Sequence, residues 1–408
     1  MNKKLLLTNI QTILVTSTMA LTSFGQASIA HASGLAEAIT SGTPSINLRA
    51  RYEGVTQEGK QDATAITERL LVGYKTGSYN GLSAFVEMSD AATIGSRKDF
   101  LVPLGPDAGG DSAKAVILDP SLTQLNQALL RYSTDSSSVT VGKQRVIFDN
   151  RFLGNVGWRQ TEQIYTGLSA KSKMISSVNL DYAYISKVNN PVGVELKMNS
   201  HAIQLKSDPM SFGTITGYGY FLDYDLAAKT DSQTIGARLQ GKSAISDSLK
   251  LHYHVEYASQ SDYADSKNIG GNYTRAEVAL QTSFAKFLLG QEALGGDGSS
   301  SFQTPLGTVH LFNGWADMFI GPVGGTPANG LVDNYLTVSG KAMGLKLAGT
   351  YHQFSAQKGG DQYGSEYDLL VAKKFSKTYM AGIKYASYTA DTHLKDTSKL
   401  WIWGQLKF

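Results

Sequence analysis

Apolar and polar residues alternate along most of the chain beyond residue 44. In the stretch 251–257, apolar or aromatic residues occupy every odd position, and His252, His254 and Glu256 lie between them. A period of two predicts β-strands with one buried face, because successive side chains of a strand point to opposite sides. The stretches that show the same alternation are 45–53, 82–89 and 272–281. We therefore expect an all-β protein.

About 18 strands can be placed, and the connections between them differ systematically in length. The expected strands are 45–54, 66–76, 81–90, 124–133, 138–147, 162–170, 175–186, 200–207, 211–223, 231–241, 247–258, 272–282, 285–291, 332–339, 344–354, 365–374, 379–389 and 398–408. Short connections are expected at 76–81, 134–137, 171–174, 242–246 and 374–378. Long connections are expected at 91–122, 148–161, 187–199, 259–271, 291–331 and 355–364.

This alternation of short and long connections favours a membrane barrel over a soluble β-sandwich. In outer-membrane barrels the strand number is even, the periplasmic turns are short and the extracellular loops are long. A sandwich has no physical reason to place all its long loops at one end. We predict a transmembrane antiparallel β-barrel of about 18 strands with short periplasmic turns and long extracellular loops.

The N-terminal residues 1–32 have the pattern of a secretory signal peptide. Lys3 and Lys4 precede an apolar stretch, and the small residues Ala30 and Ala32 mark a cleavage site before Ser33. A membrane-spanning helix needs about 18 uninterrupted apolar residues, and polar residues break this stretch. Residues 33–408 are then expected to form one barrel domain in the outer membrane of a Gram-negative bacterium.

The final strand supports the same localisation. Apolar or small residues alternate along it and end at the C-terminal Phe408. A terminal aromatic residue on an alternating strand resembles the signal that the barrel-assembly machinery recognises. We therefore expect two partners, the lipid of the outer membrane and this machinery. Trp401 and Trp403 fall on the opposite face of the strand, where a simple aromatic girdle does not place them.

Composition removes several alternatives but does not identify a partner. The chain of 408 residues has no cysteine, which excludes disulfides and thiolate metal sites. Its charged residues make up 17%, fewer than the roughly 25% usual for soluble proteins. The formal net charge is +3, and loss of Lys3 and Lys4 with the signal peptide would leave +1. Only the placement of charge can therefore indicate a ligand.

Several arginines fall on the more polar faces of the expected strands. A cation at a lipid-facing position costs about 2–4 kcal/mol at the bilayer midplane, so these side chains are expected in the lumen. They are Arg49, Arg51, Arg69, Arg131, Arg238 and Arg275. Carboxylates are expected on the same side, so a mixed ladder of charges that only holds the barrel shape is an alternative. Those carboxylates are Glu53, Glu87, Glu256, Glu277, Glu366 and Asp368.

A second group of cations lies where an expected strand meets a long loop. Its members are Lys143, Arg145, Arg151 and Arg159. Gathered cations suggest a surface that handles anions. The alternative is a solvated hairpin end, which this stretch alone favours because runs of charge are usually solvated. Lys143 and Arg145 share the parity of apolar Val139 and Val141, so a bulge must turn them inward or they lie at the membrane rim. Guanidinium groups suit the carboxylates of acidic sugars.

The longest expected loop, 291–331, is too apolar to remain in water. Phe302, Phe312 and Trp315 lie in it, and glycines near both of its ends permit sharp reversals of the chain. Long loops without secondary structure are usually functional. We predict that this loop folds over or into the barrel mouth as a constriction or lid. The alternative is an outward loop that only stabilises its neighbours.

Three stretches, in this order, carry a resemblance to a known family. They are LNQALLRY at 125–132, GKQRVIFDNRFLGNVGWRQTEQ at 142–163 and FQTPLGTVHLFNGWADMFIGPVGGTPAN at 302–329. Together they resemble the alginate-export family of outer-membrane porins. The resemblance implies an 18-stranded barrel with an Arg-lined, anion-favouring channel, and a polyuronate as the substrate of the family's namesake. This chain is shorter than the namesake, and Lys143 stands where an arginine is expected.

The sequence therefore favours a porin that passes anionic solutes, such as acidic sugars or a polyuronate like alginate. A barrel enzyme and an adhesin or receptor that acts through its loops are the alternatives, and ion conductance separates the channel from both. No catalytic constellation is apparent, and we expect no cofactor. His252, His254 and Glu256 could approach a metal from one strand face, but no third histidine accompanies them, so no metal site is predicted.

Overall fold

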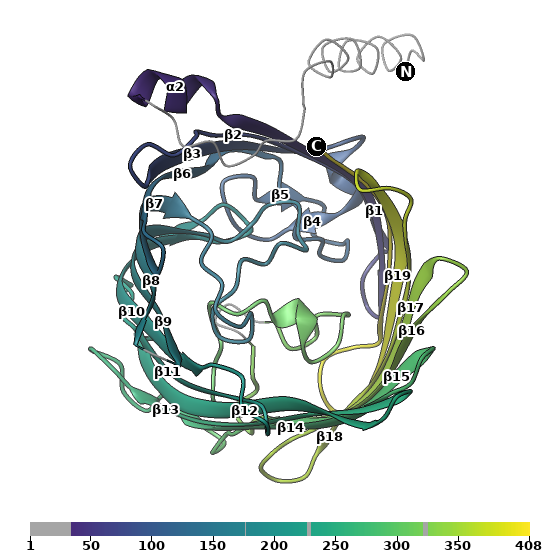
Figure 1. Cartoon of the computed structure of the whole chain (residues 1–408). Coiled ribbons are helices and arrows are strands. Elements are labelled where there is room, and N and C mark those ends of the chain that lie inside the picture. The colour runs from purple at the N-terminus through teal and green to yellow at the C-terminus, as the bar shows by residue number, and fades with distance from the viewer. Residues whose placement is uncertain (1–33, 176, 227–229, 321–324) are drawn as a thin grey trace.

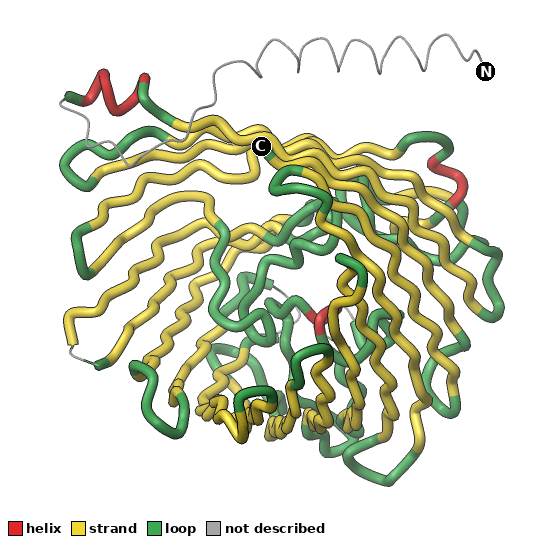
Figure 2. Tube along the Cα trace, turned by 45° about the vertical axis from the view of Figure 1, so that its right-hand side comes forward, coloured by secondary structure: helices red, strands yellow, loops and turns green. Residues whose placement is uncertain are grey.

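The computed structural model describes residues 34–175, 177–226, 230–320 and 325–408. Within these residues, 18 strands form one antiparallel sheet that closes on itself (Figures 1 and 2). The first strand, β1 (Thr43–Gln57), closes the barrel by pairing with the last strand, β20 (Thr397–Lys407). The predicted fold is confirmed. The signal peptide predicted for residues 1–32 lies outside the described residues.

The remaining barrel strands follow each other around the ring in sequence order. They are β2 (Ala63–Lys75), β3 (Leu82–Thr93), β6 (Leu122–Ser133), β7 (Ser137–Gln144), β8 (Ile164–Ile175), β9 (Val178–Asn189), β10 (Glu195–Ser207), β11 (Thr214–Leu222), β12 (Ser232–Ser246), β13 (Leu249–Asp262), β14 (Gly271–Gln281), β15 (Ala285–Leu294), β16 (Leu331–Ala342), β17 (Leu345–Ser355), β18 (Gln362–Lys374) and β19 (Tyr379–Ala390).

Three predicted connections are misplaced. The short turns expected at 171–174 and 242–246 lie within β8 and β12 instead. The long connection expected at 187–199 is only 190–194, because β10 begins well before the predicted strand at 200–207. A register shift between Lys197 and Ser200 explains this last error. A bulge of this kind interrupts the alternation from which strands are recognised in a sequence.

The outer surface of the barrel is apolar. On β13, Val255 and Tyr257 are exposed on the outside, whereas Glu256 between them is buried inside. Ile235, Leu289 and Leu369 are exposed in the same way on other strands. A closed barrel with an apolar exterior is the form in which strands cross a lipid bilayer, so the protein resides in the outer membrane of a Gram-negative bacterium.

No helix within the described part of the chain is long and apolar enough to cross a membrane.

The hydrophobic core lies inside the barrel, where long connections fold inward (Figure 1). The loop 145–163 contributes Phe152, and the loop 295–330 contributes Phe302. Both rings pack on Tyr273 of β14, with ring centroids 5.2 and 5.4 Å apart. Apolar loop residues thus find inside the barrel the burial that water cannot provide.

The third inserted loop, 94–121, carries short elements of its own. They are η1 (Arg97–Asp99), β4 (Leu101–Val102) and β5 (Gly109–Gly110), and the loop 295–330 contains η2 (Val309–Leu311). Phe100 and Val102 pack on Val55 and Ala63 at the loop end of the barrel wall. The inserted loops therefore occupy the extracellular half of the lumen.

The closed sheet leads to a first prediction. The purified protein should migrate differently on gels with and without boiling, because a ring of strand pairs resists detergent until it is heated. Its far-ultraviolet circular dichroism should be of the β type, and mass spectrometry should place the mature N-terminus near Ser33. A helical spectrum, or a mature chain that retains residues 1–32, would contradict this expectation.

Candidate functional site

Two arginines of β1 hold inserted loops against the barrel wall. Arg49 donates hydrogen bonds to the side chain of Gln160, at 2.9 Å, and to the carbonyl oxygen of Gly157, at 3.1 Å. Arg51 donates to the carbonyl oxygen of Trp158, at 2.6 Å, and forms an ion pair with Asp119 of the loop 94–121. The alternation of β1 turns both guanidinium groups inward, where they meet two separate loops.

Arg159 joins the loop 145–163 to the loop 295–330. Its guanidinium lies 2.9 Å from the carboxylate of Glu53 on β1 and 2.9 Å from that of Asp317. Burial alone would lower the pKa of Arg159, but the two carboxylates raise it above the usual value for arginine. Arg159 is therefore a permanent cation that holds the two loops together.

His310 connects the loop 295–330 to the barrel wall. Its Nδ1 lies 2.6 Å from Asp317, and its Nε2 lies 2.6 Å from the ammonium group of Lys384 on β19. Burial lowers the pKa of His310 to about 3, although the carboxylate of Asp317 acts in the opposite direction. The ring is therefore neutral at pH 7, so that Nδ1 donates to Asp317 and Nε2 accepts from Lys384.

Indole rings surround the Lys384 ammonium. It lies 3.6 Å from the ring centroid of Trp315 and 4.5 Å from that of Trp158, which belong to different inserted loops. Trp158 stacks on His310 and packs edge-on against Trp401 and Trp403 of β20. The two tryptophans of β20 face the lumen, which explains their parity in the sequence. Cation–π attraction and stacking thus position both loops.

Backbone groups of the loop 295–330 bind carboxylates of β18. The N–H of Trp315 donates to Asp368, at 3.2 Å, and the N–H of Ala316 donates to Glu366, at 2.7 Å. Gly314 directly precedes Trp315 with a φ of +83°, and a Cβ at this position would collide with the carboxylate of Glu366. Only glycine allows this approach, so the turn brings the loop directly onto the wall.

The segment 309–318 of this loop separates two cavities, and we call it the tip segment. The upper cavity, of about 510 Å³, opens among the long loops, and its lining includes Val309, His310, Ala316, Asp317 and Met318. The lower cavity, of about 190 Å³, lies beside β14–β17 and is lined by residues 311–315 of the tip segment. One short segment thus forms the floor of one cavity and the roof of the other.

Below the tip segment, cations line one side of the lumen. A cavity of about 360 Å³ is lined by Arg151, Lys206, Arg238 and Arg275, together with Asp149 and Glu256 among others. Arg238 pairs with Asp149 at 2.8 Å, and Arg275 pairs with Glu277 at 2.6 Å. The ammonium group of Lys206, in contrast, makes no hydrogen bond or ion pair with any described residue.

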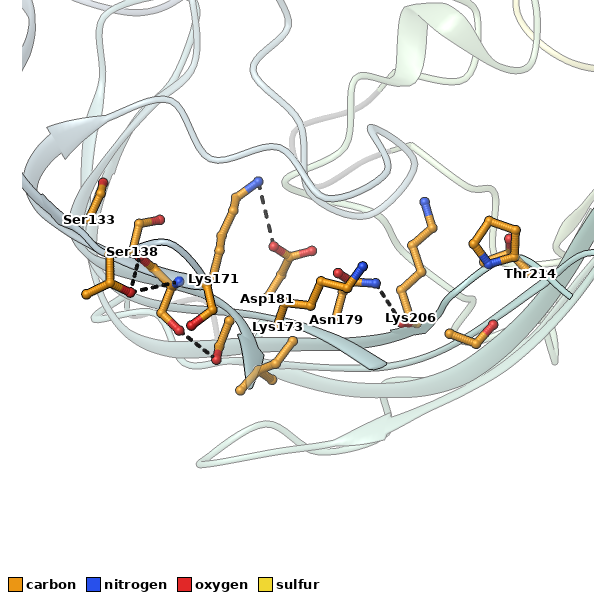
Figure 3. Close-up of a pocket in the computed structure, with 15 residues that line it drawn as sticks. Ser133, Ser138, Lys171, Lys173, Asn179, Asp181, Lys206 and Thr214 are labelled. Atoms are coloured by element: carbon orange, nitrogen blue, oxygen red, sulfur yellow. Dashed lines mark hydrogen bonds and ion pairs between the residues drawn. The ribbon is translucent and has the colours of Figure 1, made fainter. Parts of the chain in front are cut away.

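Lys206 also lines a further cavity at the periplasmic end, of about 610 Å³. Figure 3 shows the side chains of Lys171, Asp181 and Lys206 rising from the wall towards the interior. Lys171 lies 3.6 Å from Asp181, and Lys173 lies 3.3 Å from Asp208. Serine hydroxyls from β6–β8 complete this polar wall.

The structure places the predicted strand arginines inside the barrel. Arg49, Arg51 and Arg69 are buried among the inserted loops, and Arg69 lies 3.6 Å from Glu162. Arg131 faces the lumen near the periplasmic end, where it donates to Thr140 at 3.0 Å and stays open to water. Arg238 and Arg275 line the cavity below the tip segment. Their part in an ion pathway stays a prediction.

The predicted cluster in 143–159 is not one surface. Arg145 turns inward and pairs with Glu87, at 2.7 Å, and with Glu162, because β7 ends at Gln144 and the inserted loop begins there. Lys143 keeps the parity of the outward-facing Val141, and its charged neighbours are Lys187 and Glu195 at the outer rim.

Arg151 and Arg159, the other two cations of this group, are buried in the lumen. Arg151 lies 2.9 Å from Glu292 and donates to Asn313 at 3.0 Å. Its guanidinium also lies 4.9 Å from the ring centroid of Phe312. The side chains of Arg151 and Arg159 therefore position the loop 295–330. Their role in an ion pathway stays a prediction, because these contacts do not test it.

Of the residues predicted for the lid, Phe302 is fully buried in the core, and Phe312 and Trp315 line the lower cavity. The loop thus lies inside the barrel, and its action as a lid is taken up below. Lys384 and Lys206 were not singled out in the sequence. The alternation that placed the arginines inside also places Lys384 inside, between outward-facing Ile383 and Tyr385.

No protein-family model matches the sequence, and no curated protein matches it either. Solved structures match it in fold. OccK9 (OpdG) of Pseudomonas aeruginosa has a TM-score of 0.71 at 14% identity, over 91% of this chain and 100% of that one. OccAB2 of Acinetobacter baumannii has a TM-score of 0.70 at 15% identity, over 91% and 99%. OpdK of Pseudomonas aeruginosa, solved with vanillate, has a TM-score of 0.69 at 13% identity, over 90% and 98%. At these identities the likeness establishes a shared barrel fold.

Proposed function

We propose that the protein is an outer-membrane channel for small anionic solutes, in which the tip segment is the constriction. The observation that carries this proposal is the position of residues 309–318 between the upper and lower cavities. A solute that enters among the long loops meets the side of the tip segment formed by His310 and Asp317. On its other side lie Phe312 and Trp315. Displacement of the tip segment would join the two cavities.

The charges below the constriction support a preference for anions. Arg238 and Arg275 are balanced by nearby carboxylates, but Lys206 is not, and it lies where two cavities meet. Lys171 and Lys173, each of which pairs with an aspartate, continue the polar wall towards the periplasm. A narrow passage with low-dielectric walls strengthens the field of such a charge, which raises the local concentration of anions.

The charge of Lys206 provides the direct test of this proposal. Lys206→Glu should move the zero-current potential in a salt gradient towards cation preference. We expect the chloride-to-potassium permeability ratio to fall by roughly a factor of two, because the substitution changes the charge of a confined lumen by two units. Lys267→Glu makes the same change on an exposed loop outside these cavities and should leave the ratio unaltered. Equal ratios in wild type and Lys206→Glu would contradict the proposed anion path.

The solute class can be resolved by competition. The resemblance in sequence suggests acidic sugars or a polyuronate, whereas OpdK was solved with vanillate, an aromatic carboxylate. The upper cavity has apolar walls that include Leu104, Val116 and Leu118. These walls favour a compact acid with an apolar body over an extended, hydrophilic polymer. Ion current should therefore be blocked at lower concentration by vanillate than by mannuronate or an alginate oligomer, and neutral sugars should block least.

A further inference from the structure

A short helix lies outside the barrel, next to the periplasmic turn between β2 and β3. This helix, α2 (Leu35–Thr40), is separate from the ring of strands in both views (Figures 1 and 2). The N–H of Gly77 in the turn donates to the carbonyl oxygen of Ala38, at 2.8 Å. The N–H of Gly42 donates to the hydroxyl of Tyr74, at 3.0 Å, and that hydroxyl donates to the carbonyl oxygen of Ile39. The helix is therefore fixed to the barrel.

These contacts place α2 on the lipid side of the wall. Tyr74 has the parity of Val72, and both are exposed on the outer surface of β2. A helix that covers the Tyr74 hydroxyl must therefore lie outside the lumen. Gly77 permits the close approach, because a Cβ there would lie 2.8 Å from the hydroxyl oxygen of Ser41.

The helix exposes an apolar pair to its surroundings. Leu35 and Ile39 are 58% and 52% exposed, and residues four apart lie on the same helical face. Ala38 is buried against the barrel, and Glu37 lies on the face opposite to the apolar pair. The helix thus presents apolar side chains outward at the level where the barrel leaves the membrane.

Exposed apolar residues mark the same level on other periplasmic turns. Phe284, Met343 and Phe375 project from the turns after β14, β16 and β18, with exposed fractions of 69%, 90% and 63%. The described turn after β2, residues 76–81, has no such exposed large apolar residue. The apolar pair of α2 supplies it at this point of the circumference, so the helix continues the lipid-facing band.

We propose that α2 is an interfacial anchor, with Leu35 and Ile39 inserted among the phospholipids of the periplasmic leaflet. Amphipathic segments bind this way when their apolar face reaches the acyl boundary and their polar face stays at the headgroups. Here Glu37 stays on the water side. The inference concerns the membrane contact of the N-terminal segment and does not depend on the proposed channel function.

Single cysteines provide a clean test, because the chain has none of its own. The full-length mature protein with Ile39→Cys, Leu35→Cys or Glu37→Cys would carry a nitroxide label in vesicles of phosphatidylethanolamine and phosphatidylglycerol. Power saturation then compares collisions with oxygen, which partitions into lipid, and with a water-soluble nickel chelate. Labels at residues 35 and 39 should show an oxygen-to-nickel ratio several-fold above that at residue 37. This ratio should approach that of Val255→Cys on the lipid-facing wall.

Two results would overturn the anchor. A label at residue 39 that meets the nickel chelate as often as one at residue 37 places the helix in water. A label that meets neither reagent, with dipolar broadening between labels, places the helix against a second copy of the chain. If Ile39→Cys fails to assemble, the oxygen-to-nickel ratio of the label at residue 35 provides the same test. Heat-modifiable gel migration identifies the assembled protein in each case.

Discussion

Replacing residues 299–327 with a short Gly/Ser linker should raise the single-channel conductance several-fold and shift selectivity towards cations. The replacement removes the tip segment, which separates the upper and lower cavities. It also removes the backbone N–H groups that bind Glu366 and Asp368, so these carboxylates would face the open lumen. Conductance therefore rises because the obstruction is gone. The permeability to cations rises relative to that to anions because negative charge lines the widened path.

The barrel itself should survive this change. The linker would join β15 to β16, which already pair along their whole length, so no strand pairing is lost. Planar-bilayer recordings in a salt gradient measure both effects at once. Removal of residues 264–268 is the matched control, because that segment lies at the same end of the barrel but lines neither of the two cavities. Conductance and selectivity that equal those of the wild type would show that the loop is not the constriction.

The barrel could be predicted from the sequence because the residue pattern of each strand reflects the two environments that the strand separates. Each strand has one face in lipid and one in the lumen, so alternation locates it without knowledge of its partners. The prediction failed where a bulge breaks this period, as at Lys197 and Ser200. Lys143 and Arg145 share one parity, and only the end of the strand separates them: Lys143 follows the outward-facing Val141 within β7, whereas Arg145 lies beyond it.

For the interior, the sequence predicted that the long loop is buried but not which contacts it makes. The apolar residues of the long loop predicted that it must be buried, but they did not identify the wall that receives it. The ion pairs that hold the inserted loops join residues far apart in the chain, such as Arg151 with Glu292 and Arg159 with Asp317. A charge in a sequence does not name its partner, so the sequence could not show that several of the arginines predicted for an ion pathway also hold the inserted loops against the wall.

The second large effect is expected from the centre of these contacts. Arg159→Met removes a buried cation and leaves the carboxylates of Glu53 and Asp317 close together without their shared partner. Breaking a buried ion pair from one side typically costs about 3–5 kcal/mol. Because Arg159 belongs to an inserted loop, this cost should loosen the loops while the strand pairs of the wall persist. Trypsin should then cleave the folded protein within the loop 145–163 much faster than in the wild type, and open-channel current noise should rise.

Two further variants separate charge from packing at this position. Arg131→Met removes a cation that is open to lumen water and bonds Thr140, so protease resistance should stay at the wild-type level. Arg159→Met combined with Glu53→Gln neutralises the carboxylate of Glu53, while Asp317 keeps its ion pair with Lys399 at 3.2 Å, so part of the resistance should return. Cleavage of Arg159→Met at the wild-type rate would mean that the loops are held without this ion pair. Equal cleavage of the single and double variants would assign the loss to the shape of the arginine side chain and its hydrogen bonds.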